Sequence, residues 1–143
     1  MFIETFAAAA ARAVNDHDVD AVLRLWREPA AYDSPLTGPQ AGLSALAVRE
    51  SALFTGFTDL VATLQPLGQF GSTGAALVRF QGTHDGEYAG LAPTGNPIAL
   101  DMVAVVTFDE EGYVVGERVF LDTATLLAQL ARAPWGDDIR RDP

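Results

Sequence analysis

The sequence predicts a single α+β domain. In the first third of the chain, apolar residues recur at helical spacing, whereas later residues form runs rich in β-branched side chains that are separated by glycine turns. Helices followed by antiparallel strands are typical of the α+β class. The 143 residues match one domain of ordinary size. We therefore expect one domain over residues 1–133 and a polar tail over residues 134–143.

The chain begins with two predicted helices that form a short hairpin. The first covers Phe2 to Val14 and stops at a polar turn, in which we expect His17 to be solvated. Asp18 can cap the second helix, because a carboxylate at this position accepts backbone N–H bonds. The second helix has Trp26 on its apolar face and ends before Pro29.

A short extended segment and a third helix follow. Residues 30–33 can form only a brief extended piece, because two prolines and a glycine come soon after them. Apolar residues spaced from Leu43 to Phe54 predict the third helix, which Gly56 closes.

The second half of the chain predicts an antiparallel sheet and a last helix. Strands are expected at residues 60–64, 75–81, 98–108 and 113–121. A hairpin turn over residues 109–112 joins the last two strands. The last helix is predicted from about Thr123 to Ala131, with Asp122 as its N-cap.

Charge and composition exclude several classes of function. The formal net charge is −10, with no lysine and nine scattered arginines, so no basic stripe is available for nucleic acid or an anionic membrane. The lack of cysteine excludes disulfides, thiolate catalysis and the usual structural zinc sites. No phosphate-binding glycine loop or metal-spaced histidine pair appears, so no cofactor or metal is implied. There is no apolar run of membrane length, and Glu4 stands where a leader peptide has a basic flank, so we expect a cytoplasmic protein.

An ordered series of motifs along nearly the whole chain resembles the SnoaL-like polyketide cyclase family. The motifs are Tyr32-Asp33-Ser34-Pro35, Gly82-Thr83-His84-Asp85-Gly86, Pro93-Thr94-Gly95, Phe120-Leu121-Asp122, Leu127-Ala128-Gln129-Leu130 and Pro134-Trp135-Gly136-Asp137-Asp138. The resemblance implies a nuclear transport factor 2-like cone, in which a curved antiparallel sheet and three N-terminal helices enclose a pocket. It also implies a homodimer and a small hydrophobic, polyketide-like ligand.

The resemblance further assigns positions in the pocket. The aldol cyclases of the family use a histidine and an aspartate on the last two strands, and alignment places these at Ala104 and Val119, neither of which can carry a proton. A register shifted by one residue would bring Asp101 or Arg118 inward instead. Otherwise Arg118 suits an ion pair or the sheet surface. The expected lining of the pocket is Trp26, Tyr32, Phe54, Phe80, Met102, Ala104, Val119 and Leu121.

Asp33 and His84 are the candidate catalytic residues. Comparison with the related ketosteroid isomerases and limonene epoxide hydrolases places Asp33 at a general-base or water-holding position; the alternative is a turn aspartate that bonds the backbone before Pro35. His84 shares a strand face with Phe80 and can act as a second acid–base group. Its alternative role is to hold the loop over residues 85–95 by hydrogen bonds.

Three functions follow from these residues. The first is a cofactor-independent polyketide-tailoring enzyme of the cyclase, isomerase or lyase type, in which Asp33, with or without His84, moves a proton. The second is a non-catalytic domain that binds a small hydrophobic molecule, which the apolar residues at Ala104 and Val119 would explain. The third is a SnoaL-like hydroxylase that works without a bound metal.

Overall fold

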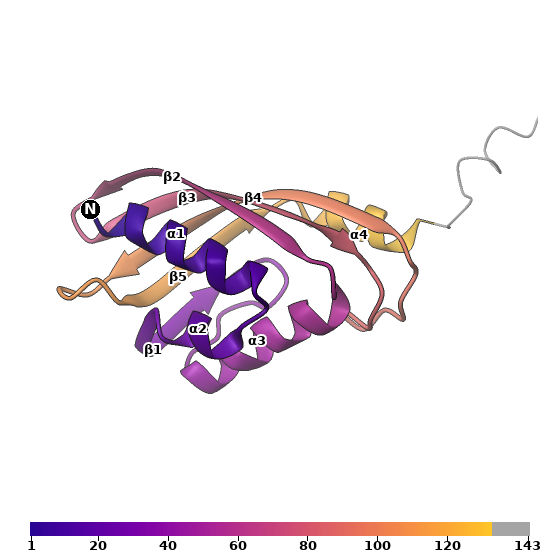
Figure 1. The fold of residues 1–143 in the computed structure, drawn as a ribbon, viewed down its shortest axis with the longest axis horizontal. Coiled ribbons are helices and arrows are strands. Elements are labelled where there is room, and N and C mark those ends of the chain that lie inside the picture. Colours follow the sequence, from indigo (N-terminus) through magenta and orange to yellow (C-terminus); the bar gives the residue numbers. More distant parts are fainter. Residues whose placement is uncertain (133–143) are drawn as a thin grey trace, which may run out of the picture.

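The computed structural model describes residues 1–132, which fold as the predicted α+β domain (Figure 1). The predicted tail, including the motif from Pro134 to Asp138, lies outside the described residues. No helix among the described residues is long and apolar enough to cross a membrane. The elements are α1 (Phe2–Asn15), α2 (Val19–Leu23), β1 (Trp26–Asp33), α3 (Leu43–Gly56), β2 (Val61–Phe70), β3 (Thr73–Thr83), β4 (Pro97–Phe108), β5 (Val114–Leu121) and α4 (Thr123–Ala131).

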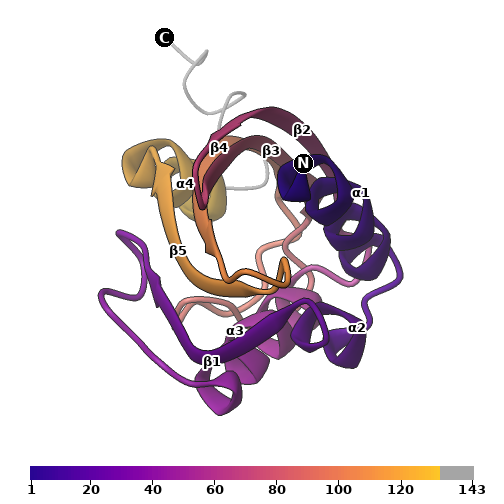
Figure 2. The ribbon, with the colours of Figure 1, turned by 90° about the vertical axis from the view of Figure 1, so that its left-hand side faces the viewer.

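The five strands form one curved, unclosed sheet in the order β1-β5-β4-β3-β2. Viewed end on, the sheet curls around an interior that α1, α2 and α3 close from the other side (Figure 2). The sequence predicted an antiparallel sheet, but the sheet is mixed, because β1 pairs in parallel with β5. These two strands lie far apart in the sequence and are not joined by a hairpin, so their relative direction is not set by a turn.

The register between β4 and β5 decides which side chains face inward. Ala104 lies opposite Val119, and both line the interior of the cone. Asp101 and Arg118 lie on the outer face, where Asp101 pairs with Arg79 and the guanidinium of Arg118 lies 5.0 Å from the ring centroid of Phe120. Ala104 and Val119 therefore face inward, as inferred from the resemblance, and the alternative in which Asp101 or Arg118 faces inward is wrong.

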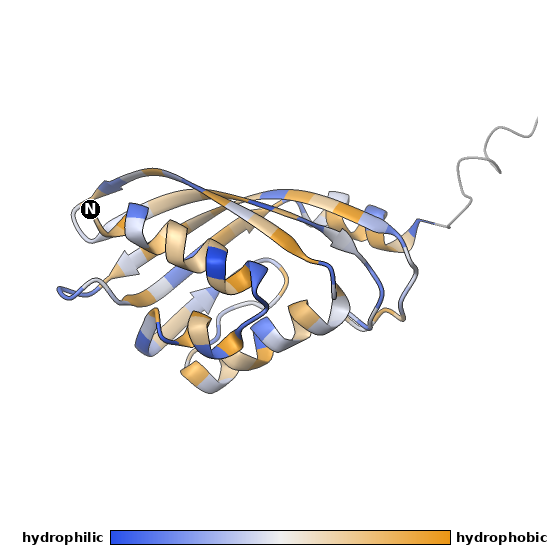
Figure 3. Cartoon of the chain, viewed as in Figure 1, coloured by the Kyte–Doolittle hydropathy of each residue, from blue (hydrophilic) through white to orange (hydrophobic). Residues whose placement is uncertain are grey.

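Helix α1 packs against the sheet through apolar side chains. Ile3 and Ala7 are almost fully buried, and Phe6 meets the ring of Phe108 on β4 edge to face at 5.9 Å. At the end of the helix, the side-chain amide of Asn15 exchanges two hydrogen bonds with the backbone of Ala62 on β2, of 2.7 and 3.0 Å. Polar residues concentrate in the connection after α1 and in the turn between β4 and β5 (Figure 3).

The second helix is shorter than predicted. Asp18 caps it as expected, with the N–H of Ala21 at 3.0 Å, but it ends at Leu23. Trp26 begins strand β1 instead of extending the helix, because the N–H of Val114 bonds the carbonyl of Leu25 at 2.9 Å and draws this segment into the sheet.

Two further expectations need correction. His17 is only partly exposed: its ring stacks on Phe54 at 4.7 Å between centroids, and Nε2 lies 2.9 Å from the carbonyl of Leu60. Strand β2 is longer than expected and continues through a register shift between Pro66 and Gly68.

Helix α4 covers the part of β4 that β5 does not reach. Asp122 is its N-cap, as predicted, and accepts a hydrogen bond from the N–H of Thr125 at 3.1 Å. The side chain of Gln129 bonds both the N–H and the carbonyl of Ala99, each at 2.9 Å, and so takes the place of a neighbouring strand. Asn96 donates to carbonyls at the end of the helix, those of Gln129 at 3.1 Å and Leu130 at 3.3 Å.

Candidate functional site

The concave face of the sheet and the three N-terminal helices enclose a cavity of about 160 Å³. Its wall is mostly apolar, as is usual for small-molecule sites. Leu36 and the hydroxyls of Ser34 and Thr37, from the loop after β1, also reach it. The apolar residues that β2, β3 and β4 contribute to the wall include Leu64, Val78, Phe80, Leu100, Met102 and Ala104.

Six of the eight residues expected to line the pocket do so: Trp26, Phe80, Met102, Ala104, Val119 and Leu121. Tyr32 and Phe54 lie outside the lining. Tyr32 is buried beside it and donates a hydrogen bond from its hydroxyl to the carbonyl of Ala45 at 3.1 Å. Phe54 packs instead against the connection between α1 and α2, because it is covered by the ring of His17.

Asp33 does not reach the cavity. It ends β1 opposite Arg118 and lines a shallow groove on the outer face of the sheet, together with Val105. The hydrogen bonds of the following turn come from Ser34, whose Oγ accepts the N–H groups of Leu36 and Thr37, each at 3.2 Å. The position of Asp33 on the outer face does not support the catalytic role suggested by the sequence. The bonds of Ser34 do not support the turn role of Asp33.

His84 is fully buried and does not line the cavity. Its Nδ1 lies 3.0 Å from the hydroxyl of Thr94, and its backbone bonds Asn96 and Gly95 at 2.9 and 2.8 Å. Nε2 has no hydrogen-bond partner among residues 1–132. These contacts favour the alternative in which His84 holds the loop, and its catalytic role stays a prediction.

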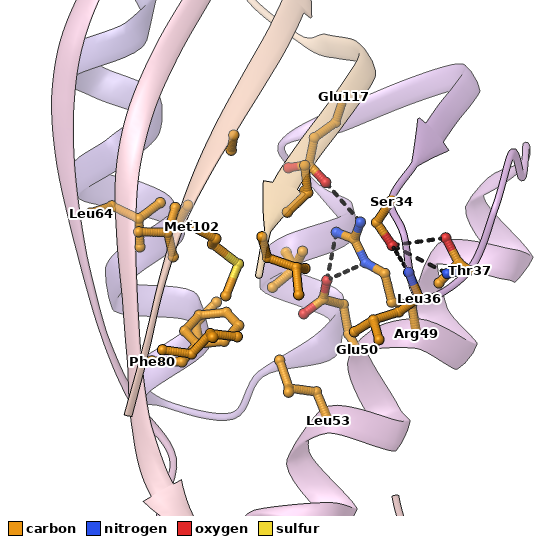
Figure 4. Close-up of a pocket in the computed structure, with 18 of the residues that line it drawn as sticks. Ser34, Leu36, Thr37, Arg49, Glu50, Leu53, Leu64, Phe80, Met102 and Glu117 are labelled. Atoms are coloured by element: carbon orange, nitrogen blue, oxygen red, sulfur yellow. Dashed lines mark hydrogen bonds and ion pairs between the residues drawn. The ribbon is translucent and has the colours of Figure 1, made fainter. Parts of the chain in front are cut away.

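A charged cluster that the sequence analysis missed lies in the wall of the cavity. It consists of Arg49 and Glu50 on α3 and Glu117 on β5, and these are the charged residues among the described part of the lining (Figure 4). Arg49 donates from Nε and Nη2 to Oε1 of Glu50, at 3.1 and 2.8 Å, and from Nη1 to Oε1 of Glu117, at 2.7 Å. The side chains of Glu50 and Glu117 are only 7% and 9% exposed.

The cluster holds the guanidinium firmly in its charged form. Burial alone lowers the pKa of Arg49, but attraction to Glu117 and Glu50 outweighs it, so the pKa is raised well above its usual range. The guanidinium also lies 4.6 Å from the ring centroid of Tyr32. Burial raises the pKa of Tyr88, another residue of the wall, which keeps its phenol neutral.

Each carboxylate of the cluster keeps one oxygen free of protein donors. Arg49 bonds only Oε1 of Glu50 and Oε1 of Glu117, and no residue in the range 1–132 donates to either Oε2. The Glu50 carboxylate points toward the apolar side chains across the cavity (Figure 4). A carboxylate fixed by a guanidinium, with one free oxygen in an apolar cavity, can take a proton from a bound molecule or return one to it.

Two signals in the sequence could have revealed the cluster. Glu50 lies four residues from both Leu46 and Phe54, so it falls on the apolar face of its predicted helix. Glu117 lies two residues before Val119, so alternation places it on the same inward face of the strand.

The family profile of SnoaL-like polyketide cyclases matches residues 4–130. The chain belongs to this family. No curated protein matches the sequence. The neighbours among solved structures share the nuclear transport factor 2-like fold, which one of them carries under its other name, the ketosteroid isomerase-like fold.

Three solved structures illustrate the range of enzymes that this SnoaL-like protein resembles. AclR from Streptomyces galilaeus, a proposed hydroxylase, superposes with a TM-score of 0.78 at 20% identity, covering 92% of this chain and 82% of the other. IdmH from Streptomyces antibioticus, a proposed polyketide cyclase, gives 0.74 at 26% identity, with 90% and 97% covered. SalBIII, an epoxide hydrolase/cyclase-like enzyme with a role in pyran ring formation in the polyether salinomycin, gives 0.72 at 22% identity, with 86% and 92% covered.

Proposed function

We propose that this SnoaL-like protein binds a small hydrophobic, polyketide-like intermediate in its cavity and catalyses a proton-transfer step of ring closure or isomerisation. The observation that carries the proposal is the buried carboxylate of Glu50, which lines an otherwise apolar cavity and has a free oxygen. Membership of the polyketide cyclase family supports the class of ligand.

In the proposed reaction Glu50 is the acid–base group. Its Oε2 takes a proton from the bound molecule and returns it at another atom, so no cofactor is consumed. Arg49 and Glu117 are positioning residues, because the guanidinium bridges the two Oε1 atoms and fixes the direction of the free oxygen. The apolar wall holds the substrate in a reactive shape. Glu50 takes the role first considered for Asp33 and His84, because neither of those side chains lines the cavity.

We also propose that the protein forms the homodimer that the family resemblance implies. The outer face of the sheet supports this, because it carries apolar side chains that are only half-buried in one chain: Leu77, Val103, Val105 and Phe120. A second copy would cover them.

The test begins with native mass spectrometry of the protein after exposure to extracts that contain polyketides. A bound compound of changed mass or isomeric form identifies the reaction, whereas an unchanged compound favours the alternative of a binding domain, for which the apolar pair of Ala104 and Val119 is the specific support. With the substrate known, Glu50→Gln should reduce turnover by a factor of about 10²–10⁴ and retain binding.

Matched variants make this test specific. Asp101→Asn removes a carboxylate on the outer face and should leave turnover unchanged. Asp33→Asn and His84→Ala test whether either of the other two candidate residues is needed for turnover. Full turnover by Glu50→Gln, or its loss in Asp33→Asn alone, would show that Glu50 is not the acid–base group.

A further inference from the structure

We infer that the cavity selects hydrophobic molecules whose polar group donates hydrogen bonds, in the order protonated amine, then hydroxyl, and that it rejects carboxylates. This inference rests on the proposed function only in that the same cavity is the binding site. It concerns which molecules enter, and not the chemistry that follows.

The first argument is the balance of charge. The charged part of the described lining is one guanidinium, Arg49, against two carboxylates, Glu50 and Glu117. The cluster therefore has one more negative than positive charge when both carboxylates are ionised. A ligand carboxylate would add a second negative charge in a place from which water is largely excluded, whereas an ammonium group would neutralise the cluster.

The second argument is the balance of donors and acceptors. Arg49 uses three of its five N–H groups, one on each nitrogen, on the two carboxylates, whereas Oε2 of Glu50 and Oε2 of Glu117 accept nothing from residues 1–132. Both side chains are more than nine-tenths buried and line the cavity, so a bound molecule can reach these acceptors from the cavity. A ligand that donates hydrogen bonds satisfies them, and a ligand that only accepts does not.

The remaining polar groups of the wall do not reverse this balance. Thr37 donates its hydroxyl to the carbonyl of Gly38 at 2.8 Å, and Ser34 and Thr37 lie 3.1 Å apart, oxygen to oxygen. The indole of Trp26 and the phenol of Tyr88 are neutral donors, which cannot offset the charge of a ligand carboxylate. Their rings favour a cation near their faces.

The experiment compares three probes of matched shape: 2-naphthylmethylamine, 2-naphthylmethanol and 2-naphthoic acid. Binding is measured by isothermal titration calorimetry at a pH where the amine is protonated and the acid ionised. We expect the amine to bind about tenfold or more tighter than the acid, with the alcohol between them. Equal binding of the acid and the amine would overturn the inference, and so would the failure of all three to bind to folded protein.

Variants show whether the cluster is the cause. Glu50→Gln and Glu117→Gln each remove one negative charge, so each should reduce the preference for the amine over the acid about tenfold. Asp101→Asn, on the outer face, should leave the preference as it is. Circular dichroism checks that each variant is folded. An unchanged preference in both cavity variants contradicts the inference. If the preference is found but Glu50→Gln keeps full turnover, the selectivity stands and the proposed proton transfer fails.

Discussion

At the scale of single residues, Arg49 and Glu50 show how the contribution of an ion pair to stability depends on its burial. Their cluster with Glu117 is mostly buried, whereas the pair of Arg79 and Asp101 on the outer face is 46% and 58% exposed. Water solvates the charges of an exposed pair when one partner is removed. A buried carboxylate that loses its partner has no such replacement.

Arg49→Met should therefore destabilise the protein by about 3–5 kcal/mol, because it leaves two buried carboxylates without their cation. Arg79→Met removes the same type of side chain from the exposed pair and should cost about 1 kcal/mol or less. Urea denaturation, followed by circular dichroism, measures both. Similar losses in the two variants would show that the cavity cluster is solvated and does not depend on its guanidinium.

The sequence pattern predicts that Glu50 and Glu117 face inward, but it does not predict that the two side chains lie close together. Each lies on a face that periodicity predicts to be buried, as shown by the neighbours Leu46 and Val119. That α3 and β5 approach each other at these residues depends on the parallel pairing of β1 with β5, which no local pattern specifies. Asp33 was a candidate because the comparison with ketosteroid isomerases and limonene epoxide hydrolases places it at a general-base or water-holding position, but it lies at the end of β1 in a groove on the outer face.

At the scale of elements, the spacing of apolar residues predicted the ends of helices and the inward faces of strands correctly where tertiary packing favours the same structure as the local sequence. Helices α1, α3 and α4 begin and end within a residue or two of the predicted limits, and the inward face of β4 is the predicted one. The second helix failed at Trp26, because pairing with Val114 overrides helical spacing in a segment too short to be stable alone.

The contact between the end of α3 and the loop after β3 depends on Gly86. The N–H groups of Asp85 and Gly86 both bond the carbonyl of Gly56 at 3.1 Å, and a Cβ on Gly86 would lie 2.0 Å from the carbonyl oxygen of Thr55. The obstacle is backbone, so the helix and the loop would have to move apart.

Gly86→Ala should therefore destabilise the protein by about 1–3 kcal/mol. Gly116→Ala is the matched control, because its Cβ would find its nearest atom at an ordinary distance of 3.8 Å, and it should change stability by about 1 kcal/mol or less. Thermal unfolding compares the two. If Gly86→Ala is tolerated as well as Gly116→Ala, this contact adapts easily and does not fix the loop that His84 holds.

At the scale of the whole molecule, the motif series predicted the cone, its cavity and its family, because these depend on the order of elements and on small residues at close contacts. The chemistry depends instead on a few side chains whose identity varies on this fold. Ala104 and Val119 illustrate the difference, since they occupy inward positions across one strand pair yet carry no proton. In the proposed function, the acid–base group comes instead from Glu50 on α3, and Glu117 on β5 helps to position it.

The outer face of the sheet leads to the last prediction, on the number of chains in the assembly. Phe120 near the end of β5 is 48% exposed on this face, opposite the half-buried Val103 on β4. In the proposed homodimer its ring would be buried by the second copy, so Phe120→Glu should place a charge in the interface and give monomers. Phe70→Glu makes the same change at the turn between β2 and β3, where the ring is 92% exposed, and should leave the dimer intact. Light scattering coupled to size exclusion gives the masses. A monomeric wild-type protein, or dissociation by Phe70→Glu in place of Phe120→Glu, would mean that this face is not the dimer interface, and its apolar side chains would then be exposed to solvent in the working protein.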